Sequence, residues 1–313
     1  MIAAVQPTNS FFRDQAMKSN AISGKGRNTI VSHPLDTQYA VKSSKNSTVA
    51  EACKGPLVTP SCLMTLYGTN GYEPQATDKN KIALVNYIGE SSNRSDATLF
   101  LQQFRPEAVG SANNFSVEII NGGRDKQTPN TAQQNEAGLD IEGNLDCQTM
   151  LGLTYPTPLV VYSIGHPHFP INKHEDYVEG VQYILDQTTI PQTISVSYGD
   201  DEQNFSKSYA TIACNLFAQL GARGTTVLFS SGDDGVGKNG TCLSNDGMNR
   251  TTFLPGFPAS CPYVTTVGGT KGFDPEVVAH NGRYSPGGGF SNYFPRPACK
   301  YSFLLRTYWT RRL

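Results

Sequence analysis

The stretch Thr225–Gly237 reads TTVLFSSGDDGVG, and it indicates the fold of the chain. Its apolar run Val227–Phe229 is typical of a buried strand, and a glycine-flanked pair of acids, Asp233 and Asp234, follows that run. In an open α/β sheet, ligands and catalytic groups gather at the carboxyl ends of the strands. An acid held there by a tight glycine turn is therefore a candidate functional residue.

Strand and helix patterns alternate on both sides of this stretch. The clearest helix is Asn204–Leu220, whose apolar residues recur at steps of three and four before Gly221 and Gly224 end it. Ser95 is the expected cap of another helix. The expected strands are 82–88, 116–120, 159–164, 193–198, 227–229 and 263–267, and the expected helices are 95–104, 136–153, 176–185 and 204–220. This alternation predicts an α/β fold with a doubly wound, mostly parallel sheet.

Length and composition limit the class of protein. A chain of 313 residues fits one large α/β domain with an extension, or two smaller domains. The formal net charge of -1 and the lack of a basic run give no reason to expect nucleic acid as a partner. No apolar run approaches the roughly 20 residues that span a bilayer, and no signal peptide is visible at the N-terminus. Residues 1–58 lack sustained periodicity and are expected to form a linker or a processed arm.

The cysteines and glycosylation tripeptides favour a secreted protein. Cys53 and Cys62 lie nine positions apart, and Cys242 and Cys261 bracket a loop rich in glycine and proline. Both pairs are disulfide candidates, with buried free thiols as an equal alternative on spacing alone. Cys214 lies on a helix face, where we expect it to pack in the core. Six asparagines stand in Asn-x-Ser/Thr tripeptides: Asn46, Asn93, Asn114, Asn204, Asn239 and Asn249.

The segment 136–153 contains two overlapping Glu-x-x-x-Asp pairs, Glu136/Asp140 and Glu142/Asp146. This spacing puts both carboxyl groups of a pair on one helix face. An apolar stripe with steps of three and four runs through Leu139, Glu142, Asp146, Met150 and Leu153. The second pair interrupts that stripe, so we expect it to be buried, with raised pKa values and a shared proton suited to acid–base catalysis. A solvated acidic face is the alternative, and it is the commoner outcome for an isolated pair.

Three other patterns have weaker functional interpretations. The segment Ser195–Glu202 ends a strand in a glycine and three acids, which alone could be a helix N-terminus. His166, His168 and His174 lack partners at metal-ligand spacing, so we expect no metal site there. Asp233 and Asp234 also invite a calcium-loop or phosphoacceptor interpretation, but the alternating oxygen ligands of a calcium loop do not follow.

Several long segments together resemble one family. In chain order they are VTPSCLMTLYG (58–68), IEGNLDCQ (141–148), ISVSYGDDEQ (194–203), CNLFAQLGARGTTVLFSSGDDGVG (214–237), FPASCPYVTTVGGT (257–270) and SPGGGFSNYFPRP (285–297). On these segments the chain resembles the sedolisins, which are serine-carboxyl peptidases that include fungal and animal tripeptidyl peptidases. Residues 4–12, AVQPTNSFF, resemble the end of the family's inhibitory prosegment.

The resemblance implies a subtilisin-like fold and endo- or tripeptidyl-peptidase activity at acid pH. Glu142 then matches the general base, Asp146 matches its proton-sharing partner, and Asp233 matches the protonated acid that donates a hydrogen bond to the oxyanion. Cys242–Cys261 matches a disulfide of fungal members. The substrate-cleft walls map onto Ser197, Tyr198, Gly199, Asp200, Gly287, Gly288 and Gly289. The family implies a peptide or protein substrate, a prosegment in the zymogen, calcium, an extracellular or vacuolar location and a monomer, with neither nucleic acid nor membrane as a partner.

The chain departs from the family at the nucleophile. The Gly-Thr-Ser-x-Ser motif does not occur in it, and Gly268-Gly269-Thr270 is followed by Lys271. We expect a prosegment tail and linker at 1–58, a partial peptidase domain at 59–297 and an unmatched tail at 298–313, as in a fragment or frameshifted product. The calcium site is then expected to be absent. We also expect exposed apolar surface at Val227–Phe229 and no activity, with a peptide-binding or inhibitory remnant as the alternative function.

Overall fold

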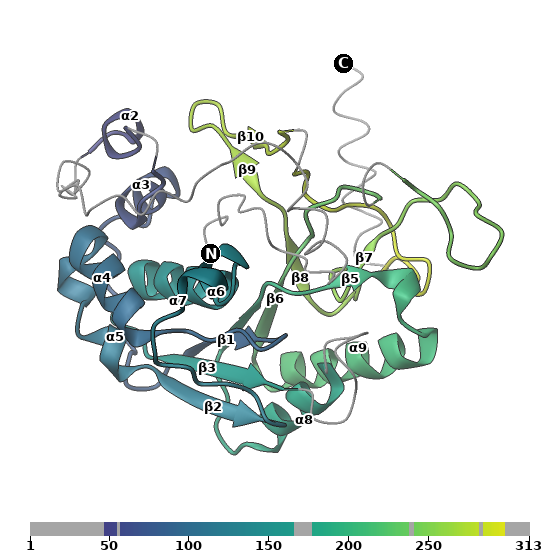
Figure 1. Cartoon of the computed structure of the whole chain (residues 1–313), viewed down its shortest axis with the longest axis horizontal. Helices are drawn as coiled ribbons and strands as arrows, with labels where there is room; N and C mark the ends of the chain where they lie inside the picture. The colour runs from purple at the N-terminus through teal and green to yellow at the C-terminus, as the bar shows by residue number, and fades with distance from the viewer. Residues whose placement is uncertain (1–46, 55–56, 166–176, 238–240, 282–283, 298–313) are drawn as a thin grey trace.

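A six-stranded sheet forms the centre of the fold. The structure is a computed structural model, and it describes residues 47–54, 57–165, 177–237, 241–281 and 284–297 (Figure 1). All neighbouring strands of the sheet are parallel, in the order β2-β3-β1-β4-β6-β8. Its strands are β1 (Ile82–Asn86), β2 (Ser116–Ile120), β3 (Leu159–Ile164), β4 (Thr193–Val196), β6 (Thr226–Ser230) and β8 (Thr265–Val267). The expected α/β fold with a parallel sheet is confirmed.

The remaining elements surround this sheet. The α-helices are α2 (Val49–Ala52), α3 (Pro60–Leu66), α4 (Arg94–Phe104), α5 (Ser111–Asn114), α6 (Ala132–Glu136), α7 (Ile141–Thr154), α8 (Tyr177–Asp186) and α9 (Lys207–Ala222), with 3-10 turns η2 (Pro106–Ala108) and η3 (Glu202–Asn204). Two short antiparallel pairs join β5 (Asp200–Asp201) to β7 (Gly256–Phe257) and β9 (Thr270–Lys271) to β10 (Val277–Val278). None of the helices in the described ranges is both long and apolar enough to cross a bilayer.

Two hydrophobic cores lie on opposite faces of the sheet. Because side chains alternate along a strand, Ala83 and Val85 of β1 point to the core that contains residues of α8 and α9. Leu84 points the other way, to the core that contains residues of α4 and α7. β3 follows the same alternation, with Tyr162 in the first core and Val161 in the second. Each face therefore needs its own layer of helices, as Figure 1 shows.

Two helices differ from expectation, one in its N-terminal cap and the other in its continuity. Asn93, rather than Ser95, caps α4, because its side-chain oxygen accepts hydrogen bonds from the backbone nitrogens of Ser95 (2.9 Å) and Asp96 (3.2 Å). The expected helix 136–153 is divided into α6 and α7. The division falls where Gly138 (φ 70°) and Asp140 (φ 60°) adopt left-handed backbone, which interrupts the helical hydrogen bonds.

The strand order creates a crevice at the carboxyl ends of β1 and β4. The chain leaves β1 toward β2 on one side of the sheet and leaves β4 toward β6 on the other. Ligands bind at such switch points in doubly wound sheets. Glu90 follows β1, Ser197 follows β4 and Asp233 follows β6, so three polar residues approach this edge from neighbouring strands.

One expectation about exposed surface is wrong. Val227 and Phe229 of β6 are buried, at 4% and 1% exposure, because they face the core that α9 covers. The opposite face of β4 and β6 carries Thr193 and Ser195 with the half-buried Leu228. The apolar strand predicted to be exposed is thus covered, and mainly small polar side chains lie on its other side.

Two disulfides cross-link the part of the chain that the structure describes. One joins Cys53 to Cys62. The second joins Cys261 to Cys214 rather than to Cys242, so the expected Cys242–Cys261 pair does not form and Cys242 is a free thiol. Cys214 lies on the buried face of α9, which brings its Cα atom within 5.6 Å of the Cα atom of Cys261. Sequence spacing alone does not reveal this proximity.

We predict that replacing Cys214 and Cys261 together by serine lowers the free energy of unfolding by about 2–4 kcal/mol, because the bridge closes a loop of 47 residues. Urea denaturation measures the loss. The control Cys242→Ser removes a free thiol and is expected to change stability by less than about 0.5 kcal/mol. A peptide map that links Cys242 to Cys261 would contradict the assignment.

Candidate active site

The two carboxyl groups of the apolar stripe lie buried in the first half of α7. Glu142 is 2% exposed and Asp146 is 4% exposed, as their place in the stripe predicts. Gly143, between them, permits a close approach by the loop that follows β1. A Cβ atom at this position would lie 2.6 Å from the carbonyl oxygen of Ser91. The pair is therefore enclosed by the helix that carries it and by the loop after β1.

The pKa of Asp146 is raised to about 7. Burial is the largest cause, and the nearby charge of Glu90 adds to it. Hydrogen bonds with the side chains of Ser197 and Glu142 act in the opposite direction. Asp146 is thus protonated below neutral pH and shares a hydrogen bond with Glu142, which is the relation needed for proton exchange between two acids.

Glu90 is a third buried acid that sequence reasoning missed. It is 1% exposed, and its carboxyl group lies 3.5 Å from the backbone nitrogen of Gly143. The available signal was its place four residues after the buried strand β1, next to Gly89.

The other Glu-x-x-x-Asp pair, Glu136 and Asp140, is structural. Glu136 is exposed, and Asp140 accepts a hydrogen bond from the backbone nitrogen of Ser91 at 2.9 Å.

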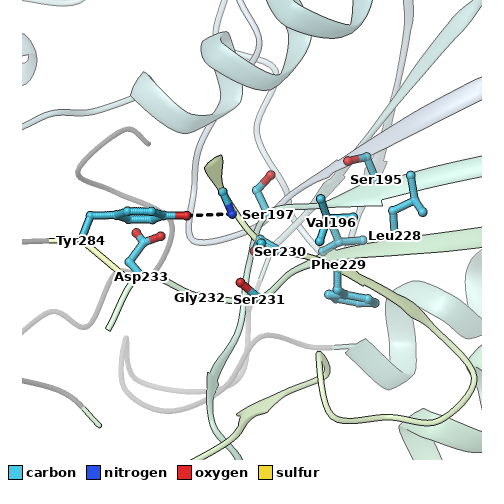
Figure 2. Close-up of a pocket in the computed structure, with 13 residues that line it drawn as sticks. Ser195, Val196, Ser197, Leu228, Phe229, Ser230, Ser231, Gly232, Asp233 and Tyr284 are labelled. Atoms are coloured by element: carbon cyan, nitrogen blue, oxygen red, sulfur yellow. Dashed lines mark hydrogen bonds between the residues drawn. The ribbon is translucent and has the colours of Figure 1, made fainter. Parts of the chain in front are cut away.

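Asp233 lines a cavity of about 60 Å³ at the carboxyl ends of β4 and β6. Figure 2 shows its carboxyl group beside the ring of Tyr284. The hydroxyl groups of Ser230 and Ser231, which also line the cavity, are buried and have no hydrogen-bond partner among the described residues. Asp234 does not line this cavity, so the structure separates the two neighbouring acids.

A larger cavity of about 810 Å³ lies beside α7. Asp146 and Met150 of the helix form one side, and Thr193 and Ser195 of β4 form another. Ser195 lines both cavities, so the two adjoin at β4. The arrangement places an acid pair at one cavity and a separate acid at the next, with the hydroxyl group of Ser197 between Asp146 and the smaller cavity.

The expected cleft residues are divided among different environments. Of the seven, only Ser197 lines these two cavities. The ring of Tyr198 is buried in the core on the α9 side, where it meets Tyr87 edge-on at 5.4 Å between centroids. The ring of Tyr198 therefore lies away from both cavities, and the assignment of these seven residues to a substrate cleft stays a prediction. Asp200 is half-buried and begins β5, and a Cβ atom built at Gly289 would lie 3.8 Å from the Cβ atom of Pro255.

Glu202 connects the loops around the site. It is 1% exposed and accepts hydrogen bonds from the hydroxyl groups of Ser260 (2.7 Å) and Ser291 and from the backbone nitrogen of Asn292 (2.7 Å). Two of these donors, Ser291 and Asn292, belong to the glycine-rich segment, and Ser260 belongs to the segment after β7. Glu202 thus holds the glycine-rich segment 287–292 against the loop that follows β4.

The predicted histidine pattern falls outside the described residues, because 166–176 are not described. Within the ranges that the structure does describe, three or more His, Cys, Asp or Glu side chains nowhere form a group able to hold a metal ion.

Known proteins resemble this chain over most of its length. It is 37% identical over 308 residues to tripeptidyl-peptidase SED2 of Arthroderma otae, in a match that covers 95% of this chain and 47% of that protein. It is 39% identical over 253 residues to tripeptidyl-peptidase sed4 of Aspergillus fumigatus, covering 77% and 40%. The chain therefore spans about half the length of these curated relatives. No protein-family model matches it.

Among solved structures, sedolisin from Pseudomonas has the same fold. That serine-carboxyl proteinase, in a complex with pseudo-iodotyrostatin, superposes with a TM-score of 0.53 at 20% identity. The match covers 77% of this chain and 64% of the sedolisin chain. The subtilisin-like α/β arrangement is thus shared with that protein.

We predict that Asp146→Asn stabilises the chain at neutral pH. The pKa of Asp146 is about 7 in the fold against 3.8 as its ordinary value, so the folded state binds the extra proton between these values. The contribution of Asp146 to the free energy of unfolding is therefore complete near pH 4. It falls as the pH rises toward 7, by an amount on the order of 2–4 kcal/mol. Asparagine has no charge to bury and removes this loss.

Urea denaturation at about pH 4.5 and about pH 7.5 measures the difference between the two proteins. The variant should gain stability over the unaltered chain at the higher pH only. Asp246→Asn, at an exposed loop carboxyl group, is the matched control and should not reproduce the gain. Equal pH dependence of the Asp146→Asn variant and the unaltered chain would refute the prediction.

Proposed function

The chain is a homologue of sedolisin-type tripeptidyl-peptidases, and we propose that it carries the carboxyl part of an acid serine-carboxyl peptidase site. The observation that carries the proposal is the buried pair on α7. Asp146 has a pKa raised to about 7 and hydrogen-bonds to Glu142, while Ser197 connects it to the edge where Asp233 lies. An acid pair that holds a proton at acid pH suits peptide-bond hydrolysis there.

Each acid has a distinct proposed role. Glu142 takes the proton of the nucleophile as general base, and Asp146 orients Glu142 and shares that proton. Asp233, protonated, donates a hydrogen bond to the oxyanion of the tetrahedral intermediate. The environments support this division, because Glu142 and Asp146 lie together under the β1 loop whereas Asp233 lines a separate cavity.

The nucleophile is the part that these 313 residues do not supply, because they contain no Gly-Thr-Ser-x-Ser motif. The larger cavity beside α7 is the space we propose for a nucleophile-bearing segment, since Asp146 lines it. The substrate is a peptide or protein, and the relatives' names favour release of tripeptides over internal cleavage. We further propose a prosegment in the zymogen and a secretory route.

A second candidate is a peptide-binding or inhibitory remnant without catalysis. The two adjoining cavities at Ser195 favour it, because they offer space for a bound peptide. Peptide binding by a monodisperse sample that shows no turnover would distinguish this function from catalysis. Calcium is implied by the family resemblance, and we assign it no residue in this chain.

We predict that the purified 313-residue chain does not cleave a tripeptidyl p-nitroanilide at about pH 4.5, because covalent catalysis needs a nucleophile that the acids alone do not replace. The direct assay is release of nitroaniline over the uncatalysed rate. A fusion of residues 1–297 to the remaining part of Arthroderma otae SED2 should gain activity.

In that fusion, Glu142→Gln is expected to lower kcat by about 10²-fold or more, and Asp233→Asn by about 10²–10³-fold. Asp234→Asn is the matched control, because its side chain does not line the cavity, and it should keep nearly full activity. Cleavage by the unfused chain, or an active Glu142→Gln fusion, would overturn the proposed roles.

A secretory route also predicts which asparagines carry glycans. Asn114 and Asn249 are exposed, whereas Asn93 is 5% exposed and its side chain caps α4. Asn46 and Asn239 lie outside the described residues. Asn204 is also exposed. Enzymatic deglycosylation in ¹⁸O water of protein from a secreting eukaryotic host should label Asn114, Asn204 and Asn249 but not Asn93. Label at Asn93 in folded protein would contradict this assignment.

A further inference from the structure

Tyr284 shares the small cavity with Asp233, and none of the functional patterns in the sequence includes it. Its side chain is 5% exposed, and its hydroxyl oxygen accepts a hydrogen bond from the backbone nitrogen of Gly269 at 3.1 Å (Figure 2). The backbone of Tyr284 is also held, because its nitrogen donates to the side-chain oxygen of Asn281 at 2.9 Å. Tyr284 is therefore held both at its backbone and at its hydroxyl group.

Gly269 makes this fixation possible. A Cβ atom at position 269 would lie 2.1 Å from the hydroxyl oxygen of Tyr284, so a larger residue would displace the ring. The main chain thus approaches the phenol closely enough to donate to it directly. The hydroxyl oxygen is consequently occupied as an acceptor, and its own proton remains as the group that Tyr284 can donate.

Asp233 is the acid whose charge acts on Tyr284, and it lines the same cavity. The backbones of the two residues belong to segments that pair side by side, since the nitrogen of Ser285 donates to the carbonyl oxygen of Asp233 at 2.7 Å. The nitrogen of Gly287 likewise donates to the carbonyl oxygen of Gly232 at 3.0 Å. Both side chains line the same cavity of about 60 Å³, in which one carboxyl oxygen of Asp233 is buried.

The surroundings of Tyr284 favour the neutral form of its hydroxyl group, which can donate a hydrogen bond. Burial raises the pKa of Tyr284, and the charge of Asp233 raises it further, against the smaller effect of the Gly269 hydrogen bond. The other ionisable groups close by are Asp234 and His280, whose Nδ1 atom hydrogen-bonds to the hydroxyl group of Ser285 at 2.5 Å. Neither lines the cavity. Tyr284 therefore keeps its proton at acid and neutral pH.

We propose that Tyr284 is a positioning residue that donates its hydroxyl proton to one carboxyl oxygen of Asp233. A protonated carboxyl group has one O–H donor and one carbonyl acceptor. Donation from Tyr284 to the carbonyl oxygen places the Asp233 O–H on the other oxygen, which then faces the substrate oxyanion. The chain of donors then runs from the Gly269 N–H through Tyr284 to Asp233. The role toward a substrate rests on the proposed peptidase function, whereas the hydrogen bond itself does not.

The test is a pH titration by NMR of the 313-residue chain with ¹³C-labelled aspartate and tyrosine. Removing the donor with Tyr284→Phe should raise the pKa of Asp233 by about one unit, because a donor favours the ionised carboxylate. Tyr293→Phe is the matched control. Its hydroxyl group donates to the carbonyl oxygen of Phe205 at 2.7 Å, away from the cavity, and its loss should leave Asp233 unchanged.

The reciprocal variant keeps the test decisive if Tyr284→Phe does not fold. Asp233→Asn should lower the pKa of Tyr284, whereas Asp234→Asn should not. An unchanged Asp233 titration in folded Tyr284→Phe, or an unchanged Tyr284 titration in Asp233→Asn, would show that the tyrosine only fills space.

Failure of the peptidase proposal gives a different result. In that case Tyr284 and Asp233 still affect each other's pKa in the NMR titration, while the SED2 fusion stays inactive. In an active fusion, Tyr284→Phe should lower kcat by about tenfold with little change in KM, and should shift the pH profile. The Tyr293→Phe fusion should keep both parameters and the profile.

Discussion

The structure depends on a buried hydrogen bond between two acids, Glu142 and Asp146. Two ionised carboxylates in this space would repel each other without water to screen them, so the packing of α7 against the sheet requires at least one proton on the pair. The nearby Glu90 strengthens this requirement. The position of α7 and the protonation state of its acids are therefore linked, and conditions that favour the proton also favour the packed helix.

Glu202 shows a second way to bury an acid. It accepts hydrogen bonds from Ser260, Ser291 and Asn292, so donors from three residues surround its carboxyl group. The contrast separates the roles of the acids in one molecule. Glu202 organises loops, while the acid pair on α7 keeps a proton available. An acid residue near the crevice therefore cannot be assigned a role from its position alone, and its hydrogen-bond donors decide the matter.

Local patterns were sufficient for the parallel sheet and for the burial of Glu142 and Asp146, because both follow from periodicity along a single element. Such patterns do not predict which distant segments contact each other. Glu90 meets α7 only through the turn after β1, and Cys214 meets Cys261 only because α9 packs beside the chain after β7. The ring of Tyr198 points into the core because the sheet, and not the motif around the residue, sets the face that a residue presents at the end of a strand.

The Cys214–Cys261 bridge also affects the integrity of the polypeptide. The bridged loop contains β6 and the Asp233 segment, together with the exposed turn around Met248, which is 69% exposed. Exposed loop tips are the preferred sites of proteolytic nicking. A single cut there would leave two polypeptides that remain covalently joined, with β6 still paired to β4 and β8. Such a nicked form would migrate as two bands only after reduction, while its fold stays whole.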